Sequence, residues 1–98
     1  MSEISGFLDA EGRLKQFPAK RKKKLLALEY LAGKLDKDAV YTEKQVNELL
    51  TGWHTFGDPA TLRRELFTAG FLNRTPDGSQ YRLADPQPTA EALLERYS

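Results

Sequence analysis

The chain has 98 residues, and its 15 lysines and arginines nearly balance 14 aspartates and glutamates, which gives a net charge of +1. This length and the 40% hydrophobic content fit one folded domain with a small core and exclude a globally disordered chain. The absence of cysteine excludes disulfides and thiolate metal sites, and no apolar run approaches the ~20 residues that span a bilayer. Because the N-terminus also lacks a signal-peptide pattern, we predict a soluble cytoplasmic protein with no membrane partner.

Apolar and turn residues near the N-terminus predict a β-hairpin over residues 7–17. Phe7-Leu8 and the segment 13–17 flank Asp9-Ala10-Glu11-Gly12, which is a type I turn sequence with glycine at its last position. Pro18 then opens a helix predicted to run to Gly33. From Leu25 onward this helix is apolar around most of its circumference, which predicts a central place in the core.

The next stretch predicts a brief strand and a capped second helix. Val40-Tyr41 supplies the strand, and Thr42 with Gln45 three residues later forms a capping box. An apolar stripe at helical spacing follows, made of Val46, Leu49, Leu50 and Trp53. Residues 54–57 make the turn to the next helix. We expect Trp53 and Phe56 to be core residues rather than platforms on which nucleic-acid bases stack.

The stretch from Asp58 to Leu83 predicts a third helix followed at once by a hairpin. Asp58 is a good N-cap, Pro59 fits the first helical position, and Gly70 can take the left-handed conformation that ends a helix. Strand-like residues 71–74 and 80–83 surround Pro76-Asp77-Gly78. We therefore predict an α+β, winged helix-turn-helix-like fold: an N-terminal hairpin, three core helices, a wing over 71–84 and a short terminal helix.

A stiff linker, Pro86-Gln87-Pro88, separates the last segment from the rest of the chain. Beyond it, the apolar stripe of a short helix consists of Ala90, Leu93, Leu94 and Tyr97. We divide the chain into a winged-helix-like domain over residues 1–85 and a linked helix over 86–98. The stripe is either a seam for a homodimer or a regulator partner, or a cap on the core of this chain.

The predicted third helix is the candidate recognition element for nucleic acid. With Leu62 and Leu66 turned inward, its opposite side presents small residues beside an arginine. This combination permits close approach to the major groove and bidentate recognition of guanine. The expected base-facing residues are Thr61, Arg64 and Thr68. An exposed polar face of this kind is also what any amphipathic helix presents to water.

Basic residues outside this helix face are candidate phosphate ligands. Seven basic side chains and no acidic one lie between Arg13 and Lys24, whereas the other residues hold 8 basic and 14 acidic ones. Lys20 to Lys24 fall at a predicted helix N-terminus, where they oppose the macrodipole and repel one another. Phosphate binding would relieve both costs; a solvated face is the alternative explanation. The expected phosphate-binding residues are Lys20, Arg21, Lys22, Lys23, Lys24, Arg63, Arg74 and Arg82.

Catalytic motifs are weak in this sequence. His54 is the single histidine, which excludes a cluster of histidines around a metal ion. Neither a nucleophile with a nearby base nor a glycine-rich phosphate loop is discernible. We therefore expect no enzyme, no cofactor and no metal site.

Two strings carry a resemblance to a known family. Residues 13–23 follow the pattern R-L-K-x-F-P-x-K-x-K-K, and residues 41–50 follow Y-T-E-K-x-V-N-E-x-L. With the stretch 58–83, they make the chain from Phe7 to Leu83 resemble a bacterial family of unknown function. Its members occur alone or at the C-terminal end of transcriptional regulators that already carry a helix-turn-helix. The resemblance implies a winged-helix-like domain associated with transcription control, and it assigns no functional residue.

These features lead to the hypothesis of a small nucleic-acid-binding protein in transcription regulation, with duplex DNA as the expected ligand. The alternative is a non-catalytic domain for protein interaction, dimerisation or effector sensing. One structural requirement separates the two. Binding to DNA needs the run from Lys20 to Lys24, the third helix and the wing to share one face.

Overall fold

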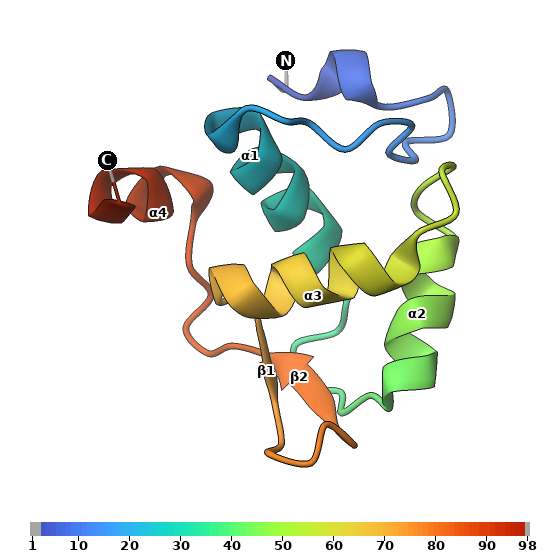
Figure 1. Cartoon of the computed structure of the whole chain (residues 1–98), viewed down its shortest axis with the longest axis vertical. Coiled ribbons are helices and arrows are strands. Elements are labelled where there is room, and N and C mark those ends of the chain that lie inside the picture. The colour runs from blue at the N-terminus through green and yellow to red at the C-terminus, as the bar shows by residue number, and fades with distance from the viewer. Residues whose placement is uncertain (1–2, 98) are drawn as a thin grey trace.

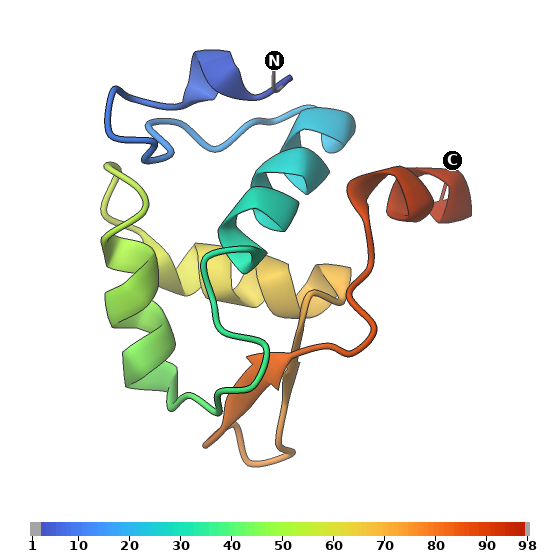
Figure 2. The ribbon, with the colours of Figure 1, turned by 180° about the vertical axis from the view of Figure 1, so that it is seen from behind.

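The computed structural model describes residues 3–97 and shows a small α+β fold (Figures 1 and 2). After a short 3-10 helix (Ser5–Phe7), the described residues form four α-helices: α1 (Arg21–Ala32), α2 (Glu43–Thr51), α3 (Pro59–Ala69) and α4 (Ala90–Tyr97). A two-stranded antiparallel sheet, β1 (Leu72–Arg74) and β2 (Tyr81–Leu83), lies between α3 and α4 in the chain. In Figure 1, α3 crosses the front of the molecule, with the hairpin below it and α4 to one side.

Helix α1 is at the centre of the core, as its apolar circumference predicted. Leu28 and Leu31 of this helix are buried together with Leu62 and Leu66 of α3. The helix begins at Arg21 rather than at Pro18. The reason is local, because the backbone at Lys20 is extended (φ −74°, ψ 135°) and that residue occupies the N-cap.

The local signals at the starts of α2 and α3 are confirmed. The Thr42 hydroxyl accepts the Gln45 N–H at 3.1 Å, and the Gln45 side chain accepts the Thr42 N–H at 2.9 Å, which completes the capping box. Asp58 caps α3 through its side chain, and Gly70 ends the helix with a left-handed backbone (φ +97°). These caps fix where α3 begins and ends, and therefore which of its residues face outward.

The brief strand predicted at Val40-Tyr41 is reduced to a single bridge, in which Tyr41 lies beside Tyr81 of β2. Tyr41 and Tyr81 exchange two backbone hydrogen bonds, of 2.8 and 2.7 Å. Within the hairpin, Leu72 pairs with Leu83 and Arg74 pairs with Tyr81. The segment before α2 therefore anchors the hairpin from which the chain turns back toward α4.

The N-terminal hairpin is likewise reduced to one bridge, between Leu8 and Leu14. Leu14 also donates its N–H to the Trp53 carbonyl at 2.7 Å and accepts the Thr55 N–H at 2.9 Å. The hairpin is therefore tied to the turn between α2 and α3. This long-range attachment has no signal in the local sequence pattern.

Helix α4 packs on α1 and covers the core of this chain (Figure 2). Ala90 and Leu93 are buried, and a Glu29 carboxylate oxygen accepts the Ala90 N–H at 3.0 Å. The contacts of Ala90 and Leu93 are therefore those expected of a helix that caps the core of its own chain. The side chain of Tyr97, the last residue of the predicted stripe, lies outside the described residues. Among residues 3–97, no helix combines the length and the apolar composition needed to cross a membrane.

Candidate nucleic-acid interface

Helix α3 carries the residues predicted to face DNA bases. Arg64 and Thr68 lie one turn apart and are both exposed, whereas Thr61 is half-buried. Asp58 Oδ1 accepts the Thr61 backbone N–H at 3.2 Å, and bonds from the Thr61 hydroxyl and N–H keep the pKa of Asp58 below its ordinary value. Thr61 is therefore committed to the helix cap. Arg64 and Thr68 are the polar groups that the outer side of α3 offers to a ligand.

Arg63, one of the predicted phosphate ligands, has an internal role. Its guanidinium pairs with Glu43 at 2.7 Å, donates to Asn47 Oδ1 and lies over the Tyr81 ring at 5.8 Å. The side chain is only 12% exposed. Arg63 thus joins α3 to α2 and to the hairpin, and we leave it out of the candidate interface.

The basic run at the start of α1 divides between two sides of the helix. Arg21 and Lys24 lie on the side toward α3, where they line a groove together with Thr68. Lys24 pairs with Glu65 of α3 at 2.9 Å and lies 5.6 Å from the Phe17 ring centroid. A phosphate that approaches this side of α1 meets two cations and must compete with Glu65 for Lys24.

The other side of α1 is turned away from α3. Lys22 pairs with the Glu3 carboxylate at 2.9 Å, and Lys23 donates to the Glu3 carbonyl at 2.9 Å. The bond from Lys22 also lowers the pKa of Glu3. Lys22 lines a separate groove beside α4 rather than the groove beside α3. The run is therefore not a single patch, and its cost in repulsion is partly offset by Glu3 and Glu65.

The two arginines of the C-terminal hairpin lie on opposite faces of it. Arg74 pairs with Tyr81 across the strands, and its guanidinium lies 4.2 Å from the Phe67 ring centroid of α3. Arg82 pairs with Asn73 at the next position, where the pleat directs side chains to the other face. Arg74 therefore extends the α3 surface, whereas Arg82 is directed away from it.

The hairpin turn is held by a compact set of hydrogen bonds around Asp77. Its Oδ1 accepts from the Thr75 hydroxyl at 2.7 Å, from the Ser79 N–H at 3.0 Å and from the Ser79 hydroxyl at 2.8 Å. These bonds lower the pKa of Asp77 from its ordinary value of 3.8 to about 2, and the bond from Thr75 has the largest effect. The ionised carboxylate and the left-handed Gly78 (φ +74°) together fix the turn that presents Arg74.

His54 holds the turn between α2 and α3, a role that the sequence analysis missed. The ring Nδ1 lies 2.6 Å from the Leu50 carbonyl, and Nε2 accepts the Asp58 N–H at 2.9 Å. Since a carbonyl only accepts and an N–H only donates, the ring is neutral with its proton on Nδ1. Phe56 packs edge-on against it at 4.7 Å but is 38% exposed, so its predicted place in the core is wrong.

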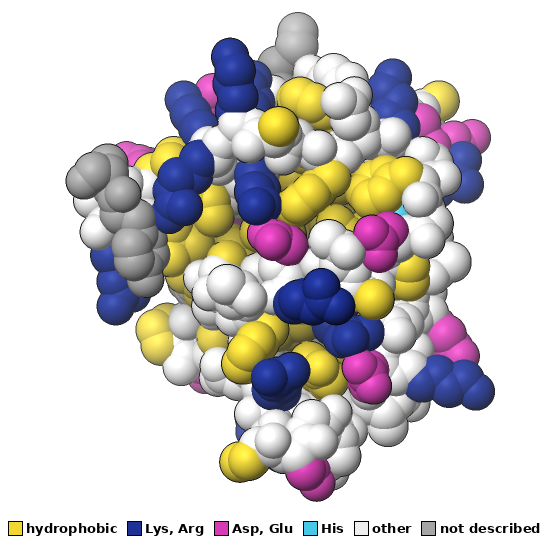
Figure 3. Space-filling view, in the orientation of Figure 1, with side chains coloured by type: hydrophobic (Ala, Val, Ile, Leu, Met, Phe, Trp, Pro, Cys, Tyr) yellow, Lys and Arg dark blue, Asp and Glu magenta, His cyan; other side chains and the backbone are white. Residues whose placement is uncertain are grey.

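One face of the molecule brings together basic side chains from three elements. In the space-filling view, Lys and Arg side chains gather over the start of α1, along α3 and over the hairpin, with acidic side chains among them (Figure 3). The contacts above assign Arg21 and Lys24, Arg64 and Arg74 to this α3 face. The requirement for α1, α3 and the hairpin to share a face is met by these four residues rather than by the whole basic run.

No group of three or more His, Asp or Glu residues among residues 3–97 is arranged to hold a metal ion. The family model described as "Uncharacterized protein conserved in bacteria (DUF2087)" matches residues 13–83, so the chain belongs to this family. This agrees with the resemblance carried by the strings at 13–23 and 41–50. The comparisons with curated proteins and with solved structures gave no match.

Proposed function

We propose that this DUF2087 protein is a non-catalytic winged-helix module that binds duplex DNA in transcription regulation. In this proposal α3 is the recognition helix and the C-terminal hairpin is the wing. The order of α1, the bridge at Tyr41, α2, α3 and a hairpin supports it, because this is the order of elements in a winged helix-turn-helix. The observation that carries the proposal is the α3 face, on which cations from α1 and from the hairpin flank an exposed arginine.

Arg64 and Thr68 are the proposed base-contacting residues. A guanidinium can donate two parallel hydrogen bonds to guanine O6 and N7, and a threonine one turn away can contact a base or the thymine methyl group. The short side chains of Ala60 and Thr68 allow α3 to approach the floor of the major groove. Base contacts of this type set sequence preference rather than overall affinity.

Arg21, Lys24 and Arg74, together with the exposed Lys20 at the α1 N-cap, are the proposed phosphate ligands. Four phosphate contacts give an expected slope of about −3.6 for log K against log salt concentration. The affinity for a duplex then falls roughly 150-fold between 50 and 200 mM salt. The pairing of Lys24 with Glu65 makes this an upper bound, because a phosphate must compete with the carboxylate.

Fluorescence anisotropy with a labelled mixed-sequence duplex, measured over a salt series, tests the phosphate contacts. The test variant is Arg21→Ala/Arg74→Ala, which removes two cations from the α3 face. The matched control is Lys22→Ala/Arg82→Ala, which removes two cations from the same helix and the same hairpin but from their other sides. We expect the slope to become shallower by about 1.8 in the test variant and to stay unchanged in the control.

Equal losses of affinity in the two double variants would show that net charge rather than this face attracts DNA, and would contradict the proposal. So would the absence of binding by the wild-type protein at about 50 mM salt, where screening is weak. The role of Arg64 is tested separately on a site selected from a random duplex library. Arg64→Ala should weaken binding to that site by about 1–3 kcal/mol while leaving mixed-sequence binding nearly unchanged.

A further inference from the structure

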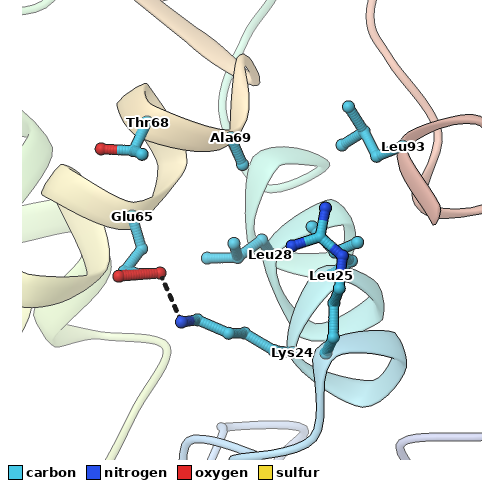
Figure 4. Close-up of a pocket in the computed structure, with 8 residues that line it drawn as sticks. Lys24, Leu25, Leu28, Glu65, Thr68, Ala69 and Leu93 are labelled. Atoms are coloured by element: carbon cyan, nitrogen blue, oxygen red, sulfur yellow. Dashed lines mark ion pairs between the residues drawn. The ribbon is translucent and has the colours of Figure 1, made fainter. Parts of the chain in front are cut away.

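A groove on the α3 face has the size and lining of a small-molecule site. It lies between α1, α3 and α4 and has a volume of about 460 Å³, within the range of ligand pockets. Its apolar part is formed by Leu25, Leu28, Ala69 and Leu93. Figure 4 shows the leucines of α1 and α4 facing the end of α3 across this space.

The polar residues that line the groove are Arg21, Lys24, Glu65 and Thr68. Arg21 and Lys24 bring two positive side chains to this lining, and Glu65 brings one negative side chain. Lys24 reaches across to Glu65 at 2.9 Å, and both side chains are about one-third exposed (35% and 31%) (Figure 4). The pair is partly open to solvent, so Glu65 can turn toward water when another anion takes its place on Lys24.

We infer that this groove binds a small aliphatic carboxylate, with the carboxylate on Arg21 and Lys24 and the carbon chain along the four apolar residues. The match is one of composition: two cations in the lining suit a carboxylate, and four apolar side chains suit a carbon chain. Arg21 is suited to the headgroup because a guanidinium holds a carboxylate with two parallel hydrogen bonds.

Occupation of the groove opposes DNA binding, a consequence that rests on the proposed function. Arg21 and Lys24 are proposed phosphate ligands, and Thr68 is a proposed base contact; all three line the groove. A bound carboxylate occupies the hydrogen-bond donors of the two cations and places its chain beside the end of α3. The bound molecule therefore acts as an effector that releases DNA.

The site itself is tested without DNA, on the full chain, by titrating ¹⁵N-labelled protein with octanoate and recording amide shifts. We expect saturable shifts at the amides of Leu25, Leu28, Ala69 and Leu93. Octan-1-ol, which has the chain without the charge, and inorganic phosphate, which has a charge without the chain, should each bind at least about tenfold more weakly. Equal binding of octan-1-ol would overturn the assignment of the cations to the headgroup.

Two variants and a control locate the site. Arg21→Gln should weaken octanoate binding about tenfold or more, because it removes a charged hydrogen-bond donor. Ala69→Leu, which fills the groove from the last residue of α3, should abolish octanoate binding while sparing the proposed DNA contacts. Lys22→Gln, on the other side of α1, should change nothing. Shifts that do not saturate by about 10 mM octanoate, or that survive Ala69→Leu, would overturn the site.

The effect on DNA is measured last, as anisotropy of the labelled duplex with and without saturating octanoate. We expect the octanoate to lower DNA affinity in the wild type and to leave it unchanged in Ala69→Leu. DNA binding without octanoate binding would overturn this inference and leave the proposed function intact. Octanoate binding by a protein that does not bind DNA would overturn the effector role and the proposed function, but not the site. Shifts at the same amides that depend on protein concentration alone would identify a second copy of the chain as the occupant and overturn the inference.

Discussion

Replacing His54 by alanine tests whether one side chain fixes the start of the α3 face. The ring is 5% exposed and joins the end of α2 to the N-cap of α3 through the Leu50 carbonyl and the Asp58 N–H. In His54→Ala the carbonyl keeps its bond from the Trp53 N–H at 2.9 Å, whereas the part-buried Asp58 N–H loses its partner. The substitution therefore removes two hydrogen bonds and leaves one donor unpaired.

The expected magnitude follows from these contacts. Each net hydrogen bond contributes about 1 kcal/mol, an unpaired buried donor costs about 1–3 kcal/mol, and the edge contact with Phe56 adds a smaller amount. We expect His54→Ala to lower the free energy of unfolding by about 2–4 kcal/mol, and the melting temperature by roughly 10–30 °C for a domain of this size.

Urea unfolding followed by circular dichroism measures this free energy, and an unchanged m-value shows that the unfolded state is the same. The neighbouring exposed residue supplies the control, since Thr55→Ala should stay within about 0.5 kcal/mol of wild type. A loss below about 1 kcal/mol in His54→Ala at constant m would refute the reasoning. The bridge between Leu14 and His54, rather than the ring, would then be what holds the turn.

Three further predictions follow from the contacts around the α3 face. Arg63→Ala should lower the free energy of unfolding, measured in urea, by about 1–2 kcal/mol, because it breaks the pair with Glu43. The salt dependence of DNA binding should stay unchanged, and a shallower salt slope would show that Arg63 does contact DNA. Leu93→Ala should lower the free energy of unfolding by about 2 kcal/mol, because it removes a buried side chain from the α1–α4 contact. The mass found by sedimentation equilibrium should not change, whereas loss of a dimer would show that α4 forms a seam between two copies. In the folded protein the pKa of Asp77 is about 2, below its ordinary value of 3.8. Its contribution to stability is therefore complete above pH 3.8 and is lost as the pH falls from 3.8 toward 2. Thermal unfolding from pH 5 to pH 2 should therefore show a shallower decline in Asp77→Asn than in wild type, and parallel curves would contradict the turn network.

The helices and the hairpin could be predicted from the sequence because their determinants are local. Thr42 and Gln45 lie one turn apart, and Asp58 lies three residues before the amide that it caps. Interactions of this range depend on spacing, which a sequence displays directly. The late start of α1 differs because Pro18 is compatible with a first helical position, but the backbone stays extended through Lys20.

The candidate site could be predicted only in part, because charge at a surface depends on distant partners. Glu3 lies 20 residues before Lys23, and Glu65 lies 41 residues after Lys24, so neither pairing has a sequence signal. Arg63 and Arg64 are adjacent and identical in type, yet Arg63 is mostly buried and pairs with Glu43, whereas Arg64 is exposed. Helical periodicity separates their directions by about 100°, but it does not reveal which direction holds a carboxylate.

The division of the basic residues also bears on how strongly one copy of the chain can hold DNA. Eight phosphate ligands would make the salt dependence of binding about twice as steep as the four that lie on or beside the α3 face, and Glu65 competes for one of those four. Specific DNA-binding proteins reach Kd values of about 10⁻⁸–10⁻¹¹ M with interfaces that bury about 1,000–2,500 Å² of protein surface. Under the proposed function, a second reading surface, from another copy or from a protein that the chain joins, would raise the affinity for a site. Under the same proposal, an effector in the groove acts directly on the DNA contact, because two of the four proposed phosphate ligands line this groove.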